Sequence, residues 1–154
     1  MGKNSIDFDL IAGIVVTPLK KVEDERGVLL HMLRRDALHF QEFGEVYFSI
    51  TNPGIIKGWK LHKEMVQNFA VPIGELKLVI FDGREGSITY GKVNEFLLSR
   101  SEYNLITIPN KLWYSFKTIS SDASMIANCA SIPHRTGESL LKNLTTSDIP
   151  YDWH

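Results

Sequence analysis

The segment KGWKLHKEMVQ, residues 57–67, gathers polar side chains that can bind a ligand or move a proton. Lys57, Lys60, His62 and Gln67 stand close together in it, around one tryptophan. A transition metal needs several N, O or S donors that converge, and a protonated ammonium cannot act as a ligand. We therefore expect no bound metal and no other cofactor. The segment is then a catalytic or binding cluster, or an ordinary charged strand edge.

The alternation of this segment has a period of two, which is typical of a β-strand. In a strand, Trp59 and Leu61 point to one face while Lys60 and His62 point to the other. Neighbouring predicted strands can extend the polar face with Tyr47, Ser49, Gln67 and Tyr114. Such a face meets water on one side of an open sheet, or it lines the interior of a small barrel that can hold a ligand.

The rest of the chain supplies strands for such a sheet. Short apolar segments, rich in β-branched and aromatic residues and separated by turn residues, are typical of an all-β sandwich or barrel. The predicted strands are residues 13–19, 27–33, 45–51, 54–62, 66–71, 75–82, 93–99, 104–109, 112–119 and 124–131. Only residues 36–43 and 136–144 are predicted as short helices. We expect one antiparallel domain of about ten strands over residues 1–154.

Composition excludes several classes of protein. The chain has 154 residues, which is the size of one domain. Its 17 basic and 18 acidic residues give no excess of positive charge that would favour binding to nucleic acid. The longest apolar runs, such as residues 76–81, are too short to span a bilayer. An acidic interruption in residues 1–16 argues against a signal peptide, and the single cysteine, Cys129, cannot form an internal disulfide. We therefore expect a cytoplasmic protein without a membrane partner.

Two stretches resemble the conserved motifs of the cupin barrel. They are the residues from Gly58 to Gly74 and the segment PNKLWY, residues 109–114. In metal-binding cupins, the positions matched by Lys60, His62, Gln67 and Tyr114 carry two histidines, a glutamate and a third histidine. This chain keeps one of the four, His62. The resemblance implies an all-β cupin fold (a double-stranded β-helix, or jelly-roll), and the lost ligands agree with the absence of a metal.

Within the cupins, the chain resembles the RmlC-like group, the dTDP-4-dehydrorhamnose 3,5-epimerases, which work without a metal. The matching segments are DERG (24–27), FSITNPGIIKG (48–58), GELKLVIFDGR (74–84), TIPNKLWYSF (107–116) and DIPYDW (148–153). This resemblance implies polysaccharide biosynthesis, a nucleotide-sugar substrate, most simply dTDP-linked, and a homodimer.

The positions that match the family's catalytic residues depart from its pattern. The family's general base matches Lys60, and the arginine before it matches Lys57. The family's active-site lysine matches Gln67, and the tyrosine that serves as its general acid matches Ile132. The aspartate that pairs with the base has no clear counterpart. The same segment also resembles sugar 3,4-ketoisomerases, with His62 on their second histidine and Lys60 in place of the first.

Both reactions remove a proton next to a sugar ketone, so they need a base, a donor for the enolate oxygen and an acid. His62 is the predicted base, and the Lys60 ammonium would keep its imidazole unprotonated and stabilise the enolate. Tyr114 or Tyr47 would return the proton. Arg26 and Lys57 suit the substrate's diphosphate, because guanidinium and ammonium groups bind phosphate oxygens. The remaining predicted substrate-binding residues are Ser49, Gln67 and Tyr47.

Three functions remain open on these grounds. The first is an epimerase or isomerase of a nucleotide-linked 4-keto-6-deoxy sugar. The second is a catalytically reduced cupin that binds a nucleotide sugar, which fits the replaced tyrosine, aspartate and first histidine. The third is a barrel that serves as an assembly subunit.

Overall fold

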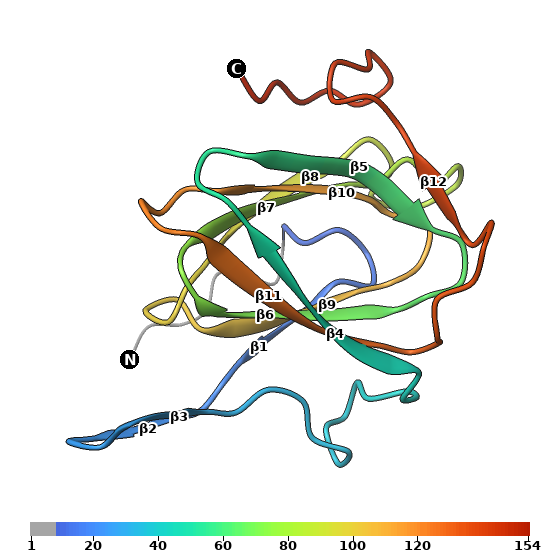
Figure 1. The fold of residues 1–154 in the computed structure, drawn as a ribbon. Coiled ribbons are helices and arrows are strands. Elements are labelled where there is room, and N and C mark those ends of the chain that lie inside the picture. Colours follow the sequence, from blue (N-terminus) through green and yellow to red (C-terminus); the bar gives the residue numbers. More distant parts are fainter. Residues whose placement is uncertain (1–8) are drawn as a thin grey trace.

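Two five-stranded β-sheets and a separate hairpin make up the computed structural model, which describes residues 9–154 (Figure 1). The first sheet has the order β1 (Val15–Pro18), β9 (Asn104–Ile108), β6 (Gln67–Ile73), β11 (Ser124–Ala130) and β4 (Glu45–Thr51). The second has the order β12 (Ser139–Leu141), β5 (Ile56–His62), β10 (Trp113–Thr118), β7 (Leu76–Phe81) and β8 (Val93–Leu98). The hairpin consists of β2 (Lys21–Asp24) and β3 (Gly27–Leu30).

The two sheets face each other, and every strand pair is antiparallel. This is the jelly-roll arrangement of a cupin, as predicted. The predictions of one domain over residues 1–154 and of no signal peptide rest partly on residues outside the described range, and they stay predictions. Along residues 9–154, no helix has the length and apolar character that crossing a membrane would require.

The two predicted short helices are wrong, since residues 9–154 contain no helix. Residues 36–43 form isolated turns, in which Ala37 N–H donates to the Arg34 carbonyl and Phe40 N–H to the Ala37 carbonyl. A single turn gains too few hydrogen bonds to offset helix nucleation. The other segment contains β12 instead, because its backbone pairs with β5 through two hydrogen bonds between Trp59 and Lys142. Strands β2 and β12 were both missing from the prediction.

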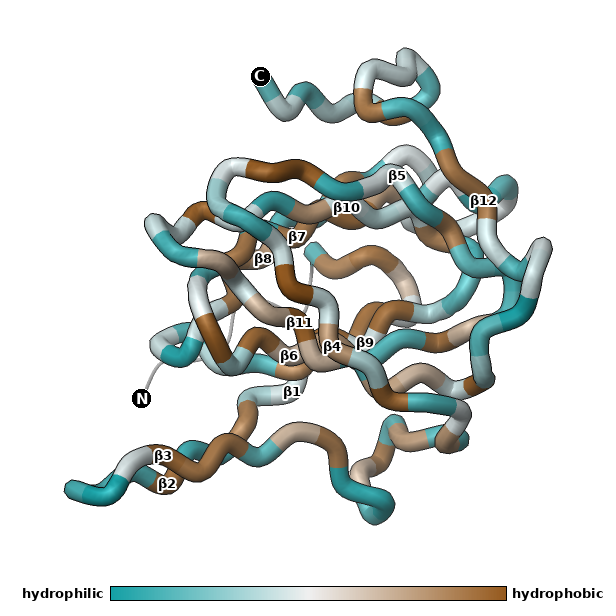
Figure 2. The backbone as a smooth tube through the Cα atoms, viewed as in Figure 1, coloured by the Kyte–Doolittle hydropathy of each residue, from teal (hydrophilic) through white to brown (hydrophobic). Residues whose placement is uncertain are grey.

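Both faces of the sheets carry apolar side chains, as β7 shows. Leu76, Leu78 and Ile80 of this strand join the cluster between the sheets. Val79 and Phe81 point outward into a second cluster with Trp59, Trp113 and Ile149. Strand β7 is therefore buried on both faces, which explains its continuous apolar run. Figure 2 shows such apolar stretches along the strands of both sheets.

The C-terminal tail, residues 142–154, covers the outer face of the second sheet (Figure 1). Ile149 is buried there, and the Tyr151 ring meets the edge of the Trp59 ring at a centroid distance of 6.2 Å. Lys77 lies over the rings of Tyr151 and Trp153. Trp59 is fully buried under this tail and directly precedes Lys60. The tail thus fixes the outer side of the strand that carries the predicted site.

A buried carboxylate holds the loop between β7 and β8. Asp82 is completely buried, and it accepts hydrogen bonds from the Arg84 side chain and backbone and from the hydroxyls of Ser87 and Thr89. Arg84 also donates to the carbonyl of Ala12, at a distance of 2.8 Å. This network ties the loop to the N-terminal part of the barrel.

Candidate active site

A cavity of about 420 Å³ lies between the two sheets. The predicted site residues that line it are Tyr47, Ser49, Lys57, Lys60, His62 and Tyr114. Tyr47 and Ser49 come from β4 of the first sheet, whereas the others come from β5 and β10 of the second. Met65, Phe69, Phe116 and Ile126 give the cavity an apolar wall. A concave, mostly apolar pocket with a few convergent polar groups is the usual form of a small-molecule site.

A β-bulge on β5 brings both lysines into this cavity. Lys57 and Lys60 are three residues apart, so a regular strand would point them to opposite faces. The pairing with β10 shifts between Tyr114, which faces Lys60, and Ser115, which faces Gly58, and Trp59 is the extra residue. Gly58 has a positive φ of 125°, and a Cβ atom there would lie 2.7 Å from the Ser115 backbone, so glycine is required.

Two of the predicted residues do not line the cavity. Gln67 is buried in β6 behind it, and its side-chain carbonyl accepts a hydrogen bond from Asn128 at 3.3 Å. Arg26 lies at the tip of the β2–β3 hairpin, where its side chain is 83% exposed and forms an ion pair with Asp24. The structure therefore does not bring Arg26 to the cavity of its own chain.

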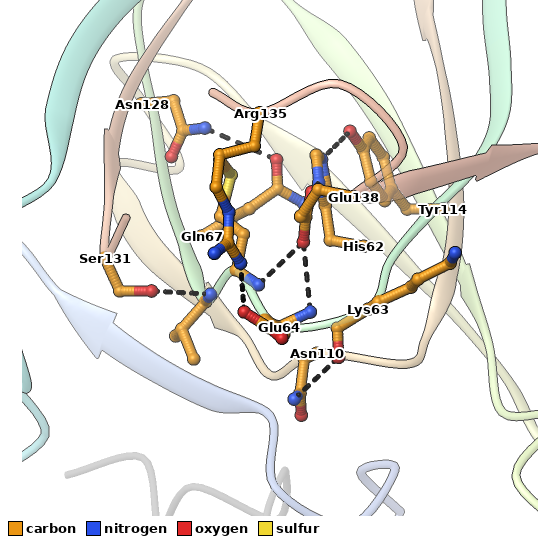
Figure 3. A network of polar contacts seen from close by, with 12 residues as sticks. His62, Lys63, Glu64, Gln67, Asn110, Tyr114, Asn128, Ser131, Arg135 and Glu138 are labelled. Atoms are coloured by element: carbon orange, nitrogen blue, oxygen red, sulfur yellow. Dashed lines mark hydrogen bonds and ion pairs between the residues drawn. The ribbon is translucent and has the colours of Figure 1, made fainter. Parts of the chain in front are cut away.

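A buried glutamate that the sequence analysis missed holds the predicted base (Figure 3). The His62 Nδ1 atom lies 2.5 Å from the Glu138 Oε2 atom, and the His62 Nε2 atom lies 3.2 Å from the Tyr114 hydroxyl. Glu138 Oε1 accepts the backbone N–H groups of Glu64 and Met65 at 3.0 and 2.9 Å. Each of the three side chains is at most 6% exposed. One carboxylate thus fixes both the imidazole and the turn that follows β5.

The position of Glu138 explains why it was missed. It lies 76 residues from His62, in a segment that was predicted as helix. The one available signal was an absence, because the family's aspartate that pairs with the general base had no clear counterpart in this sequence. His134 and Glu45, which the sequence did not single out for the site, also line the cavity.

Burial sets the protonation states of the site. It lowers the pKa of His62 below its ordinary value, more than the hydrogen bond to Glu138 raises it, and the Lys60 charge lowers it further. Burial opposes ionisation of Glu138, but the bonds from His62 and the two backbone amides hold the pKa of Glu138 below its usual value. Burial also raises the pKa of Tyr114 far above its ordinary value. The site therefore holds a neutral imidazole between a carboxylate and a protonated phenol.

This arrangement leaves the Nε2 atom of His62 as the basic atom. The Nδ1–H group donates to Glu138, which selects the tautomer with a lone pair on Nε2. That lone pair accepts the hydrogen bond from Tyr114. An imidazole held in this way can remove a proton from a ligand in the cavity. Within residues 9–154, no three His, Cys, Asp or Glu side chains lie close enough together to hold a metal ion.

The family model described as dTDP-4-dehydrorhamnose 3,5-epimerase matches residues 9–153. The chain belongs to this epimerase family. A relative in Haloferax volcanii, named a probable low-salt glycan biosynthesis epimerase, is 32% identical over 120 residues, which are 77% of each chain. The spore coat polysaccharide biosynthesis protein SpsL of Bacillus subtilis is 24% identical over 147 residues, which are 94% of this chain and 97% of SpsL.

Solved structures of the epimerase family have the same fold. A dTDP sugar isomerase from Desulfovibrio desulfuricans is 41% identical, with a TM-score of 0.90 over 93% of this chain and 92% of that one. The rmlC epimerase of Mycobacterium tuberculosis is 20% identical, with a TM-score of 0.84 over 99% of this chain and 78% of that one. The family predicted from the sequence segments is thus confirmed, and so is the cupin fold.

Replacing Glu138 with Gln is expected to shift the pH dependence of turnover to lower pH. With His62 as the predicted base, kcat/KM should rise with pH through the His62 pKa, which lies below the ordinary value of about 6.5. Since Glu138 raises that pKa, its loss should move the rise of kcat/KM to still lower pH. The plateau of kcat/KM should also fall by about 10²-fold, because His62 would no longer be held in one tautomer. A pH profile of kcat/KM measures both effects. An unshifted rise would contradict the role of Glu138.

Proposed function

We propose that this protein is an epimerase of a dTDP-linked 4-keto-6-deoxy sugar, and that it works by proton abstraction next to the ketone without a metal. The observation that carries the proposal is the neutral His62 imidazole, which is anchored by Glu138 in the wall of a cavity that two lysines and two tyrosines also line. The family and the names of its relatives support the substrate class.

The proposed reaction begins with the transfer of a proton from the carbon next to the ketone to His62 Nε2. The electrons of that C–H bond move to the carbonyl oxygen and form an enolate. Lys60, half-buried beside His62 in the same cavity, is the proposed partner for that negative oxygen. One of the two phenols, Tyr114 or Tyr47, then returns a proton to the carbon.

The cavity rim suits the nucleotide part of the substrate. Lys57 is exposed at the rim, where an ammonium can meet the diphosphate without losing much hydration. Ser49 lines the cavity from β4, and we propose that it binds the sugar or its phosphate. Gln67 lies behind the cavity wall, and its proposed role is to orient Asn128 through their hydrogen bond.

We propose that the protein is a homodimer. The outer face of the edge strand β4 exposes Val46, Phe48 and Ile50, and the projecting hairpin exposes Val22 and Leu29. Exposed apolar side chains on an edge strand are typical of a surface that another chain covers. In a dimer, the hairpin is the element that can carry Arg26 to the second copy. The cytoplasm is the proposed compartment, in keeping with one unpaired, buried cysteine.

Substituting Phe48 and Ile50 with Glu is expected to convert the dimer to a monomer, because two carboxylates on this face cannot be buried without partners. Light scattering coupled to size-exclusion chromatography measures the mass. Substituting Ile88, which is 94% exposed in the loop between β7 and β8, with Glu is the matched control and should leave the dimer intact. A wild-type monomer would refute the proposed assembly.

Replacing Lys60 with Met is expected to move the acid limb of kcat/KM in the opposite direction from the Glu138 variant. The Lys60 charge lowers the His62 pKa, so its removal should raise that pKa and shift the limb to higher pH. The plateau should fall by about 10²-fold because the enolate loses its cationic partner. Rates measured from pH 5 to 9 test this, with Lys63→Met, an exposed neighbour outside the cavity, as the control.

Proton NMR in deuterated water, with dTDP-4-keto-6-deoxyglucose as the ligand, tests the function itself. We expect protein-dependent loss of the signal at a carbon next to the ketone. The position of the exchange distinguishes epimerisation at carbon 3 from epimerisation at carbons 3 and 5. Saturable line broadening without exchange would instead indicate a sugar-binding cupin that lacks catalysis. No exchange and no broadening would refute this substrate.

A further inference from the structure

Two phenols face the cavity from opposite sheets, and their hydrogen bonds differ. Tyr114 lies on β10, in the same sheet as His62, whereas Tyr47 lies on β4 of the facing sheet. A reaction that inverts a carbon needs a base on one face of that carbon and an acid on the other. The bonds that each hydroxyl makes decide which phenol can be that acid.

The proton of Tyr114 is engaged with the base. His62 uses its Nδ1–H group toward Glu138, so Nε2 carries no proton in the neutral ring. In the 3.2 Å contact between His62 Nε2 and the Tyr114 hydroxyl, Tyr114 must therefore be the donor. Its ring also lies nearly parallel to the imidazole, with an interplanar angle of 13°. Tyr114 is placed to orient the base from the base's own side.

The hydroxyl of Tyr47, unlike that of Tyr114, accepts a hydrogen bond from the protein. Asn128 faces Tyr47 across the β4–β11 pair and is completely buried. Its Oδ1 atom accepts the backbone N–H of Asn68 at 3.1 Å, which fixes the orientation of the amide. Its Nδ2 group then points to the Tyr47 hydroxyl at 2.9 Å and to the Gln67 carbonyl at 3.3 Å. Because an amide NH₂ only donates, the Tyr47 oxygen accepts.

The hydroxyl hydrogen of Tyr47 is consequently left for the cavity. Among residues 9–154, the bond from Asn128 is the one hydrogen bond of this hydroxyl, and it uses an oxygen lone pair. Burial raises the pKa of Tyr47, more than the bond from Asn128 lowers it, so the phenol carries its proton before the reaction. The same N–H group can stabilise the phenolate that forms when this proton leaves.

We propose that Tyr47 is the acid that protonates the sugar carbon on the face opposite His62, while Tyr114 orients the base. The assignment rests on the proposed function. When the Tyr47 O–H bond breaks, its proton forms the new C–H bond, and the enolate electrons supply that bond as the ketone re-forms. The site resets when the imidazolium loses a proton to water and the phenolate takes one from water. The predicted outcome is inversion of the carbon.

The test separates exchange from inversion in deuterated water, again with dTDP-4-keto-6-deoxyglucose. Tyr47→Phe should still exchange the hydrogen next to the ketone, within about threefold of the wild-type rate, because His62 removes and returns it on one face. Formation of the inverted sugar should fall by about 10²-fold. Tyr114→Phe, which removes the other hydroxyl, should slow exchange and inversion together. Melting temperatures of both variants check that the fold is retained.

Wild-type inversion in Tyr47→Phe would overturn the assignment. Exchange without inversion in Tyr114→Phe would also overturn it, because Tyr114 would then be the acid. Absence of exchange in the wild-type protein would overturn the proposed function, and the assignment of Tyr47 with it. Each result therefore identifies which of the two proposals has failed.

Discussion

Replacing His62 with Asn is expected to reduce turnover by about 10³-fold or more and to leave ligand binding within a few-fold of wild type. The reason is that His62 is the proposed base, held by Glu138 in the wall of the cavity. The Asn amide can still donate to Glu138, so the buried carboxylate keeps a partner.

Steady-state rates and ligand titrations by calorimetry measure this separation of turnover from binding. His154→Asn, an exposed histidine at the C-terminus, is the matched control and should behave as wild type. Unchanged turnover in the His62 variant would show that another group is the base. Loss of binding together with turnover, in a protein that is still folded, would favour a binding role for His62.

Substituting Asp82 with Asn is expected to lower the free energy of unfolding by about 3–5 kcal/mol, the usual cost of removing one partner of a buried ion pair. Asp82 is fully buried and accepts from Arg84, Ser87 and Thr89, so an amide in its place would oppose some of these donors with its own N–H group. Urea unfolding, followed by tryptophan fluorescence, measures the change.

Asp24 provides a matched control for Asp82. It binds Arg26 two residues later through its side chain and backbone, as Asp82 binds Arg84, but on the exposed hairpin. Asp24→Asn should therefore leave the unfolding midpoint unchanged. An equal loss of stability in both variants would show that burial of the Asp82 network is not what matters.

The Asp82 carboxylate also predicts how stability depends on pH. Burial opposes its ionisation, but the hydrogen bonds from Arg84, Thr89 and Ser87 hold the Asp82 pKa far below its usual value. The native state therefore binds fewer protons than the unfolded state in acid, and stability should fall as pH drops below the unfolded pKa of about 3.9. Asp82→Asn should lose less stability than wild type between pH 5 and pH 3.

The fold was largely predictable because period-two patterns and turn residues are local signals. Ten of the strands could be placed in this way, and the segments shared with the family set the topology. The two missed strands depend on pairing with distant or exposed partners. Strand β12 lies within residues 136–144, which have a helical pattern, yet it pairs with β5.

The candidate site was predictable only where its residues share a strand or a family motif. Lys60 and His62 follow from alternation within β5, and Tyr47 and Ser49 from alternation within β4. Glu138 could not be predicted, because its role depends on a contact between distant segments. The proposed roles of Tyr47 and Tyr114 depend on the directions of the hydrogen bonds from Asn128 and to Glu138, which no spacing in the sequence encodes.

The covering of the second sheet by the C-terminal tail has a consequence for synthesis on the ribosome. Chains emerge N-terminus first, so β5 with His62 leaves the exit tunnel long before Glu138 and the tail that packs on Trp59. While Glu138 and the tail are still inside the ribosome, His62 lacks its carboxylate partner, and the outer face of the second sheet stays uncovered. A nascent chain that stalls at this stage would therefore expose apolar strand faces without a complete site, and chaperone binding would matter most then.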